Sequence, residues 1–376
     1  MLTQIIADAI QAQGGWLGFD EFMRLALYAP GWGYYDHGSP KFGHLPESGS
    51  DFVTAPELTP LFGQTLARAV DEALAASQTD EVWEFGAGSG ALAEQLLGAL
   101  GSRLSRYTIV DLSGSLRERQ QARLAPFADK VRWLNALPER LRGVVVGNEV
   151  LDAMPVQLLV RREGAWFERG VAMAPASSLA TPLSSPLEGG KTSAFVWSDR
   201  PTCLRPSFEV VGEHDYLTET HAQGEAFVRT LADRLEQGVV FLLDYGFPEA
   251  EYYHPQRSGG TVMCHQGHRA DPDPLSAVGD KDITAHVNFT GVALAAQEAG
   301  LNVVGYTTQA HFLLNCGLMD LLQSQHPGDV VQHSRVLKLV NEHEMGEIFK
   351  VLCLSRGTPP AWDSFGFKQG DRTHRL

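Results

Sequence analysis

The pattern of apolar and polar residues divides the chain into helical and extended segments. Apolar side chains recur at helical spacing in residues 1–30 and again in residues 58–76. Short apolar runs typical of buried strands come next, and the segments between the first three are compatible with helices. The predicted strands are residues 82–85, 107–110, 131–134, 143–147, 239–243, 301–306 and 348–354. The later predicted helices are residues 91–100, 116–125, 221–236 and 284–299.

Two regions do not follow this alternation of strands and helices. Residues 156–173 alternate between apolar and polar positions, which predicts an antiparallel ribbon. Residues 174–193 are rich in Ser, Pro, Ala and Gly and predict an inserted loop, and an irregular segment extends to residue 282. Since most strands alternate with helices, the whole pattern predicts an α/β fold built on a parallel sheet.

Residues 81–90 form a predicted buried strand, a glycine turn and the start of a helix. Gly86 and Gly88 fit both a dinucleotide-binding turn and the first motif of class I methyltransferases. Glu84 favours the second interpretation, because a carboxylate repels a pyrophosphate, whereas the ammonium group of S-adenosylmethionine needs an acceptor. Asp111, after the second strand, suits the ribose of either cofactor. The remaining interpretation is a tight strand–helix turn that binds no ligand.

Composition narrows the range of partners. The 376 residues carry 45 acidic and 30 basic side chains, which gives a net charge of −15. This balance argues against nucleic acid as the main partner, because phosphate binding needs a basic face. It fits a cationic substrate or a basic protein partner, although the same charge also serves simply to keep a protein soluble.

The cysteines and the first residues bear on location. The four cysteines are far apart and show no zinc or disulfide spacing, which fits a reducing compartment. Residues 1–10 are amphipathic but lack the basic residues and cleavage site of a signal or transit peptide. No apolar run has the roughly 20 residues needed to span a bilayer. We therefore predict a cytoplasmic protein with no membrane association.

Longer blocks of sequence carry a family resemblance. The blocks are residues 31–35 (GWGYY), 51–57 (DFVTAPE), 84–90, 107–113, 147–155 (GNEVLDAMP), 244–246, 260–261, 268–269, 282–289 and 344–351. On these blocks the chain resembles the MidA-like family of S-adenosylmethionine-dependent methyltransferases over nearly its whole length. It departs from the family at Asn288, where Asp is expected, at Asp111, where Glu is common, and in the insertion at 174–193.

The resemblance implies a class I methyltransferase fold. This is an α/β, Rossmann-like core with a mostly parallel seven-stranded sheet and a final antiparallel strand. We predict a helical cap in residues 1–78 and the core in residues 79–376, with insertions at about 156–215 and 245–285. Mitochondrial members act in assembly of respiratory complex I and symmetrically dimethylate an arginine of one subunit. The implied activity is therefore protein arginine N-methylation, with an arginine-bearing protein as partner.

The glycine turn and the family blocks together predict the residues that contact the cofactor. They are Glu84, Gly86, Ala87, Gly88, Gly90, Asp111, Leu112, Asn148, Thr54 and Pro56. Thr54 and Glu57 also have the spacing of a helix capping box, so a purely structural role for that segment stays open.

Three residues are predicted to act in catalysis. Glu149 and Asp152 follow the fourth strand, where open α/β sheets bind ligands, and carboxylates orient a guanidinium bidentately. Asp152 fits the cap of a helix equally well. His286 is a candidate base, although a lone histidine is more often structural. The loop histidines and carboxylates near His265 lack the spacing of metal ligands, so we predict no metal.

Two other functions stay open at this stage. One is methylation of a small molecule, which a deep closed pocket would favour, whereas an open acidic groove would favour a protein acceptor. The other is a non-catalytic assembly factor that retains the cofactor fold. The intact Glu84, glycine turn and Asp111 argue against the second function.

Overall fold

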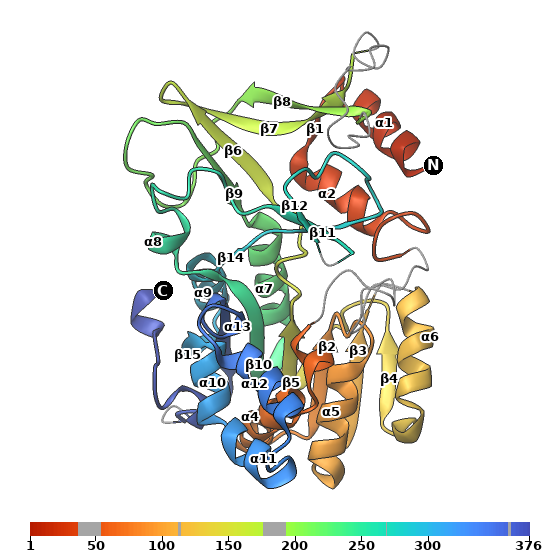
Figure 1. Cartoon of the computed structure of the whole chain (residues 1–376), viewed down its shortest axis with the longest axis vertical. Coiled ribbons are helices and arrows are strands. Elements are labelled where there is room, and N and C mark those ends of the chain that lie inside the picture. Colours follow the sequence, from red (N-terminus) through yellow and green to blue (C-terminus); the bar gives the residue numbers. More distant parts are fainter. Residues whose placement is uncertain (37–53, 112–113, 176–192, 268, 360–361) are drawn as a thin grey trace.

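The computed structural model describes residues 1–36, 54–111, 114–175, 193–267, 269–359 and 362–376. A large sheet flanked by helices forms one end of the molecule, and smaller sheets with two helices cover the other end (Figure 1). None of the helices in these ranges is both long and apolar enough to cross a membrane.

Seven of the eight strands of the large sheet follow one another in the order β15-β16-β10-β5-β2-β3-β4. Strand β16 is antiparallel to both of its neighbours, and the remaining pairs are parallel. This confirms the predicted fold class. The strands are β2 (Glu81–Phe85), β3 (Arg106–Val110), β4 (Val131–Leu134), β5 (Leu141–Asn148), β10 (Leu235–Phe247), β15 (Asn302–Thr308) and β16 (Phe349–Arg356). The short β14 (Val287–Asn288) pairs with the end of β10.

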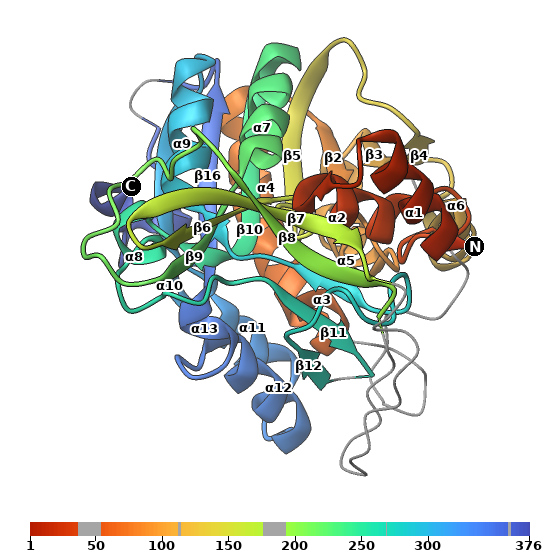
Figure 2. The same cartoon turned by 90° about the horizontal axis from the view of Figure 1, so that it is seen from above.

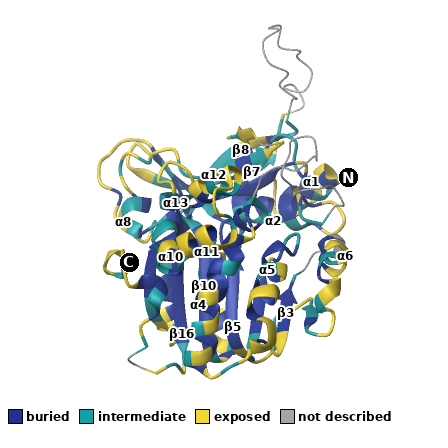
Figure 3. Ribbon diagram, turned by 60° about the horizontal axis from the view of Figure 1, so that its bottom comes forward, coloured by how far each residue is buried: buried dark blue, intermediate teal, exposed yellow. Residues whose placement is uncertain are grey.

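Helices cover both faces of this sheet, and Figure 3 shows the helices of one face in front of its buried strands. Successive residues of β10, such as Phe241 and Leu242, enter different apolar clusters on the two faces. Burial on both faces explains why these strands are continuous apolar runs in the sequence. The helices on one face are α4 (Leu61–Ser77), α5 (Ala91–Leu100), α10 (Gln309–Asn315), α11 (Leu318–Gln325) and α12 (Val330–Val340). The other face carries α7 (Ala222–Arg234) and α9 (Phe289–Glu298), and α6 (Gly114–Arg123) lies between β3 and β4 in the chain.

A second layer lies above the large sheet (Figure 2). Its five-stranded sheet contains β1 (Leu17–Gly18), β6 (Gln157–Arg162), β7 (Ala165–Met173), β8 (Phe195–Pro201) and β9 (Tyr216–Thr220). Its three-stranded sheet contains β11 (Met263–Gln266), β12 (Arg269–Asp271) and β13 (Asp282–Thr284). Helices α1 (Leu2–Ala12) and α2 (Phe19–Tyr28) share one apolar cluster with residues of these sheets. The remaining short helices are α3 (Ala55–Leu58), α8 (Glu249–Tyr252) and α13 (Met345–Ile348).

Several local predictions are confirmed and others are wrong. The antiparallel ribbon at 156–173 is confirmed by the pairing of β6 with β7. The helix predicted at 58–76 is confirmed by α4, but it begins three residues later, because Thr59 and Pro60 separate α3 from α4 and proline lacks the N–H that a continuous helix needs. The irregular segment before residue 282 contains α8, β11 and β12.

The helix predicted to begin at residue 284 instead begins at Phe289. Thr284 ends β13, whose backbone pairs with β11, and β14 pairs with β10. Asn288 then caps α9, since its side-chain oxygen accepts the N–H of Gly291 at 3.2 Å. Asn288 therefore serves as a helix cap where the family resemblance led us to expect a carboxylate.

The division at residue 78 stays a prediction. Helix α4 lies before this boundary in the chain, yet it packs with α5 and with residues of β5 and β10 in the main apolar cluster. Helices α1 and α2 pack with the second layer. Most of the insertion predicted at 174–193 lies outside the described residues.

Candidate active site

A cavity of about 660 Å³ lies between the carboxyl ends of β2, β5 and β10 and the second layer. Nearly all the predicted site residues line it: Thr54, Pro56, Glu84, Gly86, Ala87, Gly88, Asp111, Asn148, Glu149, Asp152 and His286. Gly90 is instead the residue that caps the start of α5. Leu112 lies outside the described residues. The large sheet thus brings the predicted residues at the ends of β2, β3 and β5 to one cavity.

The glycine turn presents bare backbone to the cavity. Gly86, Gly88 and Gly90 have φ angles of 63°, 53° and 80°, a region that residues with a Cβ rarely occupy. A Cβ added to Gly86 would lie 3.2 Å from Cγ2 of Val150. A side chain there would therefore be strained and would fill space that a ligand needs.

Glu84 is a buried carboxyl group at the wall of the cavity. Its side chain accepts a hydrogen bond from the Tyr107 hydroxyl at 2.7 Å, and the residue is 2% exposed. Burial raises the pKa of Glu84 to about 8, with a smaller contribution from the charge of Asp111. None of the basic side chains in the described ranges forms an ion pair with it. The site therefore fits a cationic ligand such as the ammonium of S-adenosylmethionine.

Gln120 joins two predicted cofactor residues and was missed by the sequence analysis. Its amide donates to the carbonyl oxygen of Gly88 at 3.0 Å and to Asp111 Oδ2 at 2.9 Å. Its own oxygen accepts a hydrogen bond from the indole of Trp133 at 3.0 Å. Gln120 is fully buried and fixes Asp111 relative to the glycine turn. One polar residue on a polar helix gives no signal of this role in the sequence.

The segment with capping-box spacing is tied to the glycine turn. Thr54 precedes α3 but makes no side-chain capping hydrogen bond, so the proposed capping box is not formed. The Glu57 carboxylate instead accepts hydrogen bonds from the Ser89 hydroxyl and from Arg123 at 3.0 Å. These contacts hold Thr54 and Pro56 at the edge of the cavity.

Glu149 and Asp152 form an acidic region of the cavity wall. Burial and the neighbouring Asp152 raise the pKa of Glu149 to about 8, and burial raises the pKa of Asp152 to about 6. The Asn148 amide donates to Glu149 at 3.0 Å. Within the described ranges, Asn148 Oδ1 and Asp152 Oδ1 are buried without a hydrogen-bond partner. These oxygens are suited to accept N–H groups of a ligand.

The turn that carries these acids is held by Asp244. One of its carboxylate oxygens accepts the backbone N–H groups of Val150, Leu151 and Asp152 at 3.1, 2.9 and 3.2 Å. The turn leads to β6 and no helix begins there, so the helix-capping alternative for Asp152 is wrong. Glu149 itself has a φ angle of 53°, which is strained for a residue with a side chain.

The second layer supplies residues that the sequence analysis did not single out. The Tyr35 hydroxyl donates to Asp282 at 2.9 Å, and the Tyr28 hydroxyl donates to the carbonyl of Ala153 at 2.8 Å. The two tyrosine rings stack with centroids 5.5 Å apart. All of these residues line the cavity. The aromatic turn at 31–35 was the available signal, but it did not reveal which strand end Tyr35 would meet.

His286 lies beside the acidic turn. Its ring packs edge-on against Tyr245 with centroids 5.2 Å apart. Its Nδ1 atom is buried and, among the described residues, has no hydrogen-bond partner. Burial and the charges of Arg257 and Lys350 lower the pKa of His286 to about 4. The imidazole is therefore neutral near pH 7 and a weaker base than a solvated histidine, and its catalytic role stays a prediction.

An ion pair between a buried lysine and a partly exposed carboxylate lies among the loop histidines and carboxylates near His265. Lys281 is 1% exposed and its ammonium lies 2.6 Å from Asp271. Among the residues that the structure describes, no group of three or more His, Cys, Asp or Glu is arranged to hold a metal. His268 lies outside those residues.

The raised pKa values of the cavity carboxyls should make the stability of the folded protein depend on pH. Because the pKa values of Glu84 and Glu149 rise from 4.5 to about 8 on folding, the folded protein binds more protons across that interval. Ligand-free protein should therefore lose stability as the pH rises from 5 to 8, by up to about 1.4 kcal/mol per pH unit for each group. Thermal unfolding of the wild type and Glu149→Gln should show a shallower loss in the variant; parallel curves would contradict the assignment.

Glu219 should stabilise the loop that forms one side of the cavity. Its buried carboxylate accepts the N–H groups of Thr261 and Val262 at 2.6 and 3.0 Å and the Tyr252 hydroxyl at 3.0 Å. Glu219→Gln places an N–H donor where the loop and Tyr252 present donors of their own, so the free energy of unfolding should fall by about 1–3 kcal/mol. Denaturant unfolding measures this cost, with the exposed Glu163→Gln as the control. Equal unfolding midpoints for Glu219→Gln and the wild type would contradict a stabilising role for Glu219.

Comparisons with known proteins agree with this geometry. Residues 63–307 match the model of a family described as "Putative S-adenosyl-L-methionine-dependent methyltransferase". The chain is also similar to a crystal structure of a "likely methyl transferase" from Burkholderia thailandensis bound to S-adenosyl-homocysteine. The two are 47% identical with a TM-score of 0.91, over 100% of this chain and 96% of that one.

Curated relatives are more distant. A Danio rerio protein named "Protein arginine methyltransferase NDUFAF7, mitochondrial" is 28% identical over 92% of this chain and 84% of its own length. The Homo sapiens protein of the same name is 26% identical over 89% of this chain and 79% of its own length.

Proposed function

Because the chain belongs to a family of S-adenosylmethionine-dependent methyltransferases, we propose that its methyl acceptor is an arginine side chain of a protein. The fold, the enzyme class and the cofactor follow from family membership. The arginine specificity is the further step, and it is supported by the acidic region of the cavity and by the names of the curated relatives.

The residues present fit the cofactor. Glu84 would accept a hydrogen bond from its ammonium, and the turn at Gly86 and Gly88 would contact the cofactor through bare backbone. Asp111, held in place by Gln120, would bind the ribose hydroxyls. When bound, the cofactor supplies an electrophilic methyl group. The protein's own residues then have two tasks, which are to orient the acceptor and to take up its proton.

The observation that carries the proposal is the pair of buried carboxyls on the turn after β5. Glu149 and Asp152 line the cavity and lie close enough to raise the pKa of Glu149. A guanidinium carries a fixed positive charge and donates N–H groups in a plane, so two carboxylates can orient it and draw its charge away from one nitrogen. A cation in this site would also favour the ionised form of both acids, which burial alone disfavours.

His286 would complete the reaction by accepting a proton from the acceptor. Its imidazole is neutral, lines the same cavity and has a buried nitrogen without a partner in the described ranges. The net charge of −15 fits an acceptor side chain that carries a positive charge. We extend the proposal to dimethylation of the arginine and to a cytoplasmic location, both of which are predictions from the sequence.

A labelled-methyl transfer assay tests this function. Purified protein and S-adenosylmethionine labelled in the methyl group are incubated with lysate from a strain that lacks the gene. We expect label in a small number of protein bands and none with heat-treated enzyme. Label confined to small molecules would favour the alternative of a small-molecule methyltransferase. Cofactor binding without any transfer would favour a non-catalytic assembly factor.

A further inference from the structure

A basic group of residues borders the cavity around Phe247, at the end of β10. The guanidinium carbon of Arg257 lies 3.7 Å from the centre of the Phe247 ring, and the Lys350 ammonium lies 5.7 Å from it. The His286 ring lies 5.3 Å from the same ring. Arg257 and His286 line the cavity, whereas Lys350 is buried with 3% of its side chain exposed. The methyl-transfer mechanism uses neither Arg257 nor Lys350.

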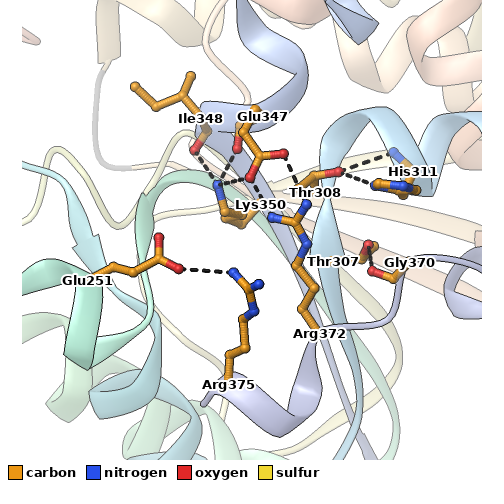
Figure 4. Close-up of polar contacts among 10 residues, drawn as sticks. All are labelled: Glu251, Thr307, Thr308, His311, Glu347, Ile348, Lys350, Gly370, Arg372 and Arg375. Carbon is orange, nitrogen blue, oxygen red and sulfur yellow. Dashed lines mark hydrogen bonds and ion pairs between the residues drawn. The ribbon is translucent and has the colours of Figure 1, made fainter. Parts of the chain in front are cut away.

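The charge of Lys350 is used within the fold (Figure 4). Its ammonium donates to the backbone carbonyl of Glu347 and to that of Ile348 at 3.4 Å, and it lies 3.9 Å from the Glu347 carboxylate. The same carboxylate binds Arg372 from the end of the chain. The Lys350 ammonium is therefore held by neighbouring groups of the fold.

Arg257 differs from Lys350 in having a free edge. In the part of the chain that the structure describes, no carboxylate forms an ion pair with its guanidinium, which stacks on the face of the Phe247 ring. Stacking on an aromatic ring uses the face of a guanidinium and leaves the N–H groups at its edge available for a planar anion. Arg257 is half-buried, so its charge is felt more strongly than that of a fully solvated arginine.

Tyr245 lies between the acidic and the basic regions. A hydrogen bond from its hydroxyl lowers the pKa of Asp152 and so opposes the larger effect of burial. Its ring packs against His286. Arg257 in turn is near enough to His286 to lower the pKa of the imidazole. The cavity therefore has a negative region at Asp152 and Glu149 and a positive region at Arg257, with an aromatic side chain between them.

Resting on the proposed arginine methylation, we propose that Arg257 determines acceptor specificity by binding an acidic side chain close in sequence to the methylated arginine. A substrate that presents a guanidinium to Glu149 and Asp152 would bring its neighbouring residues along the cavity wall to Arg257. An Asp or Glu there would form a bidentate pair with the stacked guanidinium. An acceptor with neutral or basic neighbours would leave Arg257 unpaired, which selects against it.

A peptide library tests this proposal. Each peptide contains one arginine, with glutamate fixed at one flanking position at a time and glutamine at the same position in its matched partner. The wild type should favour glutamate over glutamine at one position by about tenfold in kcat/KM. Arg257→Gln should abolish this preference, and Arg257→Lys should restore only part of it, because an ammonium pairs with a carboxylate as a point charge.

Controls separate the outcomes. Arg335→Gln, on α12 and away from the cavity, should keep the glutamate preference, and unchanged thermal unfolding of Arg257→Gln would show that the variant folds.

Methylation of the library with no acidic preference, or with the same preference in Arg257→Gln, would overturn the role of Arg257 alone. A weaker cofactor affinity in Arg257→Gln would also overturn it, since Arg257 would then serve the cofactor. No methylation of any arginine peptide would overturn this proposal together with the proposed function.

Discussion

Glu149→Gln should lower kcat by about 100- to 1000-fold while leaving the affinity for S-adenosylmethionine within about threefold of the wild type. Glutamine keeps the shape of the side chain, and its oxygen can still accept the Asn148 amide that lies 3.0 Å away. The substitution removes the negative charge that orients the acceptor guanidinium and draws the positive charge of the guanidinium away from one nitrogen. The expected loss is therefore in the transfer step, and single-turnover kinetics with saturating cofactor measures it.

A matched control exists in the same chain. Glu163 also has a positive φ angle, 49° against 53° for Glu149, but it is exposed in the turn between β6 and β7. Glu163→Gln therefore makes the same chemical change at a similar backbone position away from the cavity, and it should leave turnover unchanged. Equal turnover in Glu149→Gln and wild type would remove Glu149 from the mechanism.

Glu84→Gln should weaken binding of S-adenosylmethionine by about 10- to 100-fold. Glu84 is the buried acid at the end of β2, and we expect it to form a charge-assisted hydrogen bond with the cofactor ammonium, an interaction worth about 1.5–3 kcal/mol. The folded protein itself should not be destabilised at pH 8, because the substitution removes a carboxyl whose pKa burial raises. Isothermal titration calorimetry gives the affinity, and thermal unfolding without ligand gives the stability.

Glu81→Gln provides the comparison for Glu84→Gln. Glu81 begins the same strand but lies outside the cavity, where it forms ion pairs of 3.7 and 3.6 Å with Arg106 and Arg132. Its replacement should leave cofactor affinity unchanged. Similar weakening in both variants would show that the effect is a general one of charge and would contradict a direct role for Glu84.

The parts of the site that were predictable lie on short contiguous segments. The strand, turn and helix around Gly86 are local, so burial pattern, glycine spacing and the charge of Glu84 identified the cofactor end of the cavity. The turn from Asn148 to Asp152 follows a buried strand directly, and its position at a strand end was enough to place it at the ligand edge.

The residues that were missed depend on contacts between distant segments. Tyr35 and Asp282 are 247 positions apart in the chain, and only packing within the second layer brings them together. Gln120 reaches Gly88 across 32 positions from a helix whose polar residues look alike in sequence. The start of α9 was misplaced for a related reason, because residues before Phe289 pair as strands with partners elsewhere in the chain. Local patterns do not encode such pairings.

The chemical identity of the labelled residue tests the central claim most directly. Protein labelled by the wild-type enzyme from methyl-labelled S-adenosylmethionine is hydrolysed to amino acids, which are then separated and counted. The acidic pair at Glu149 and Asp152 predicts that the label is recovered as methylated arginine, and that Glu149→Gln loses nearly all of it. Recovery of the label in another amino acid, with none in arginine, would contradict the account.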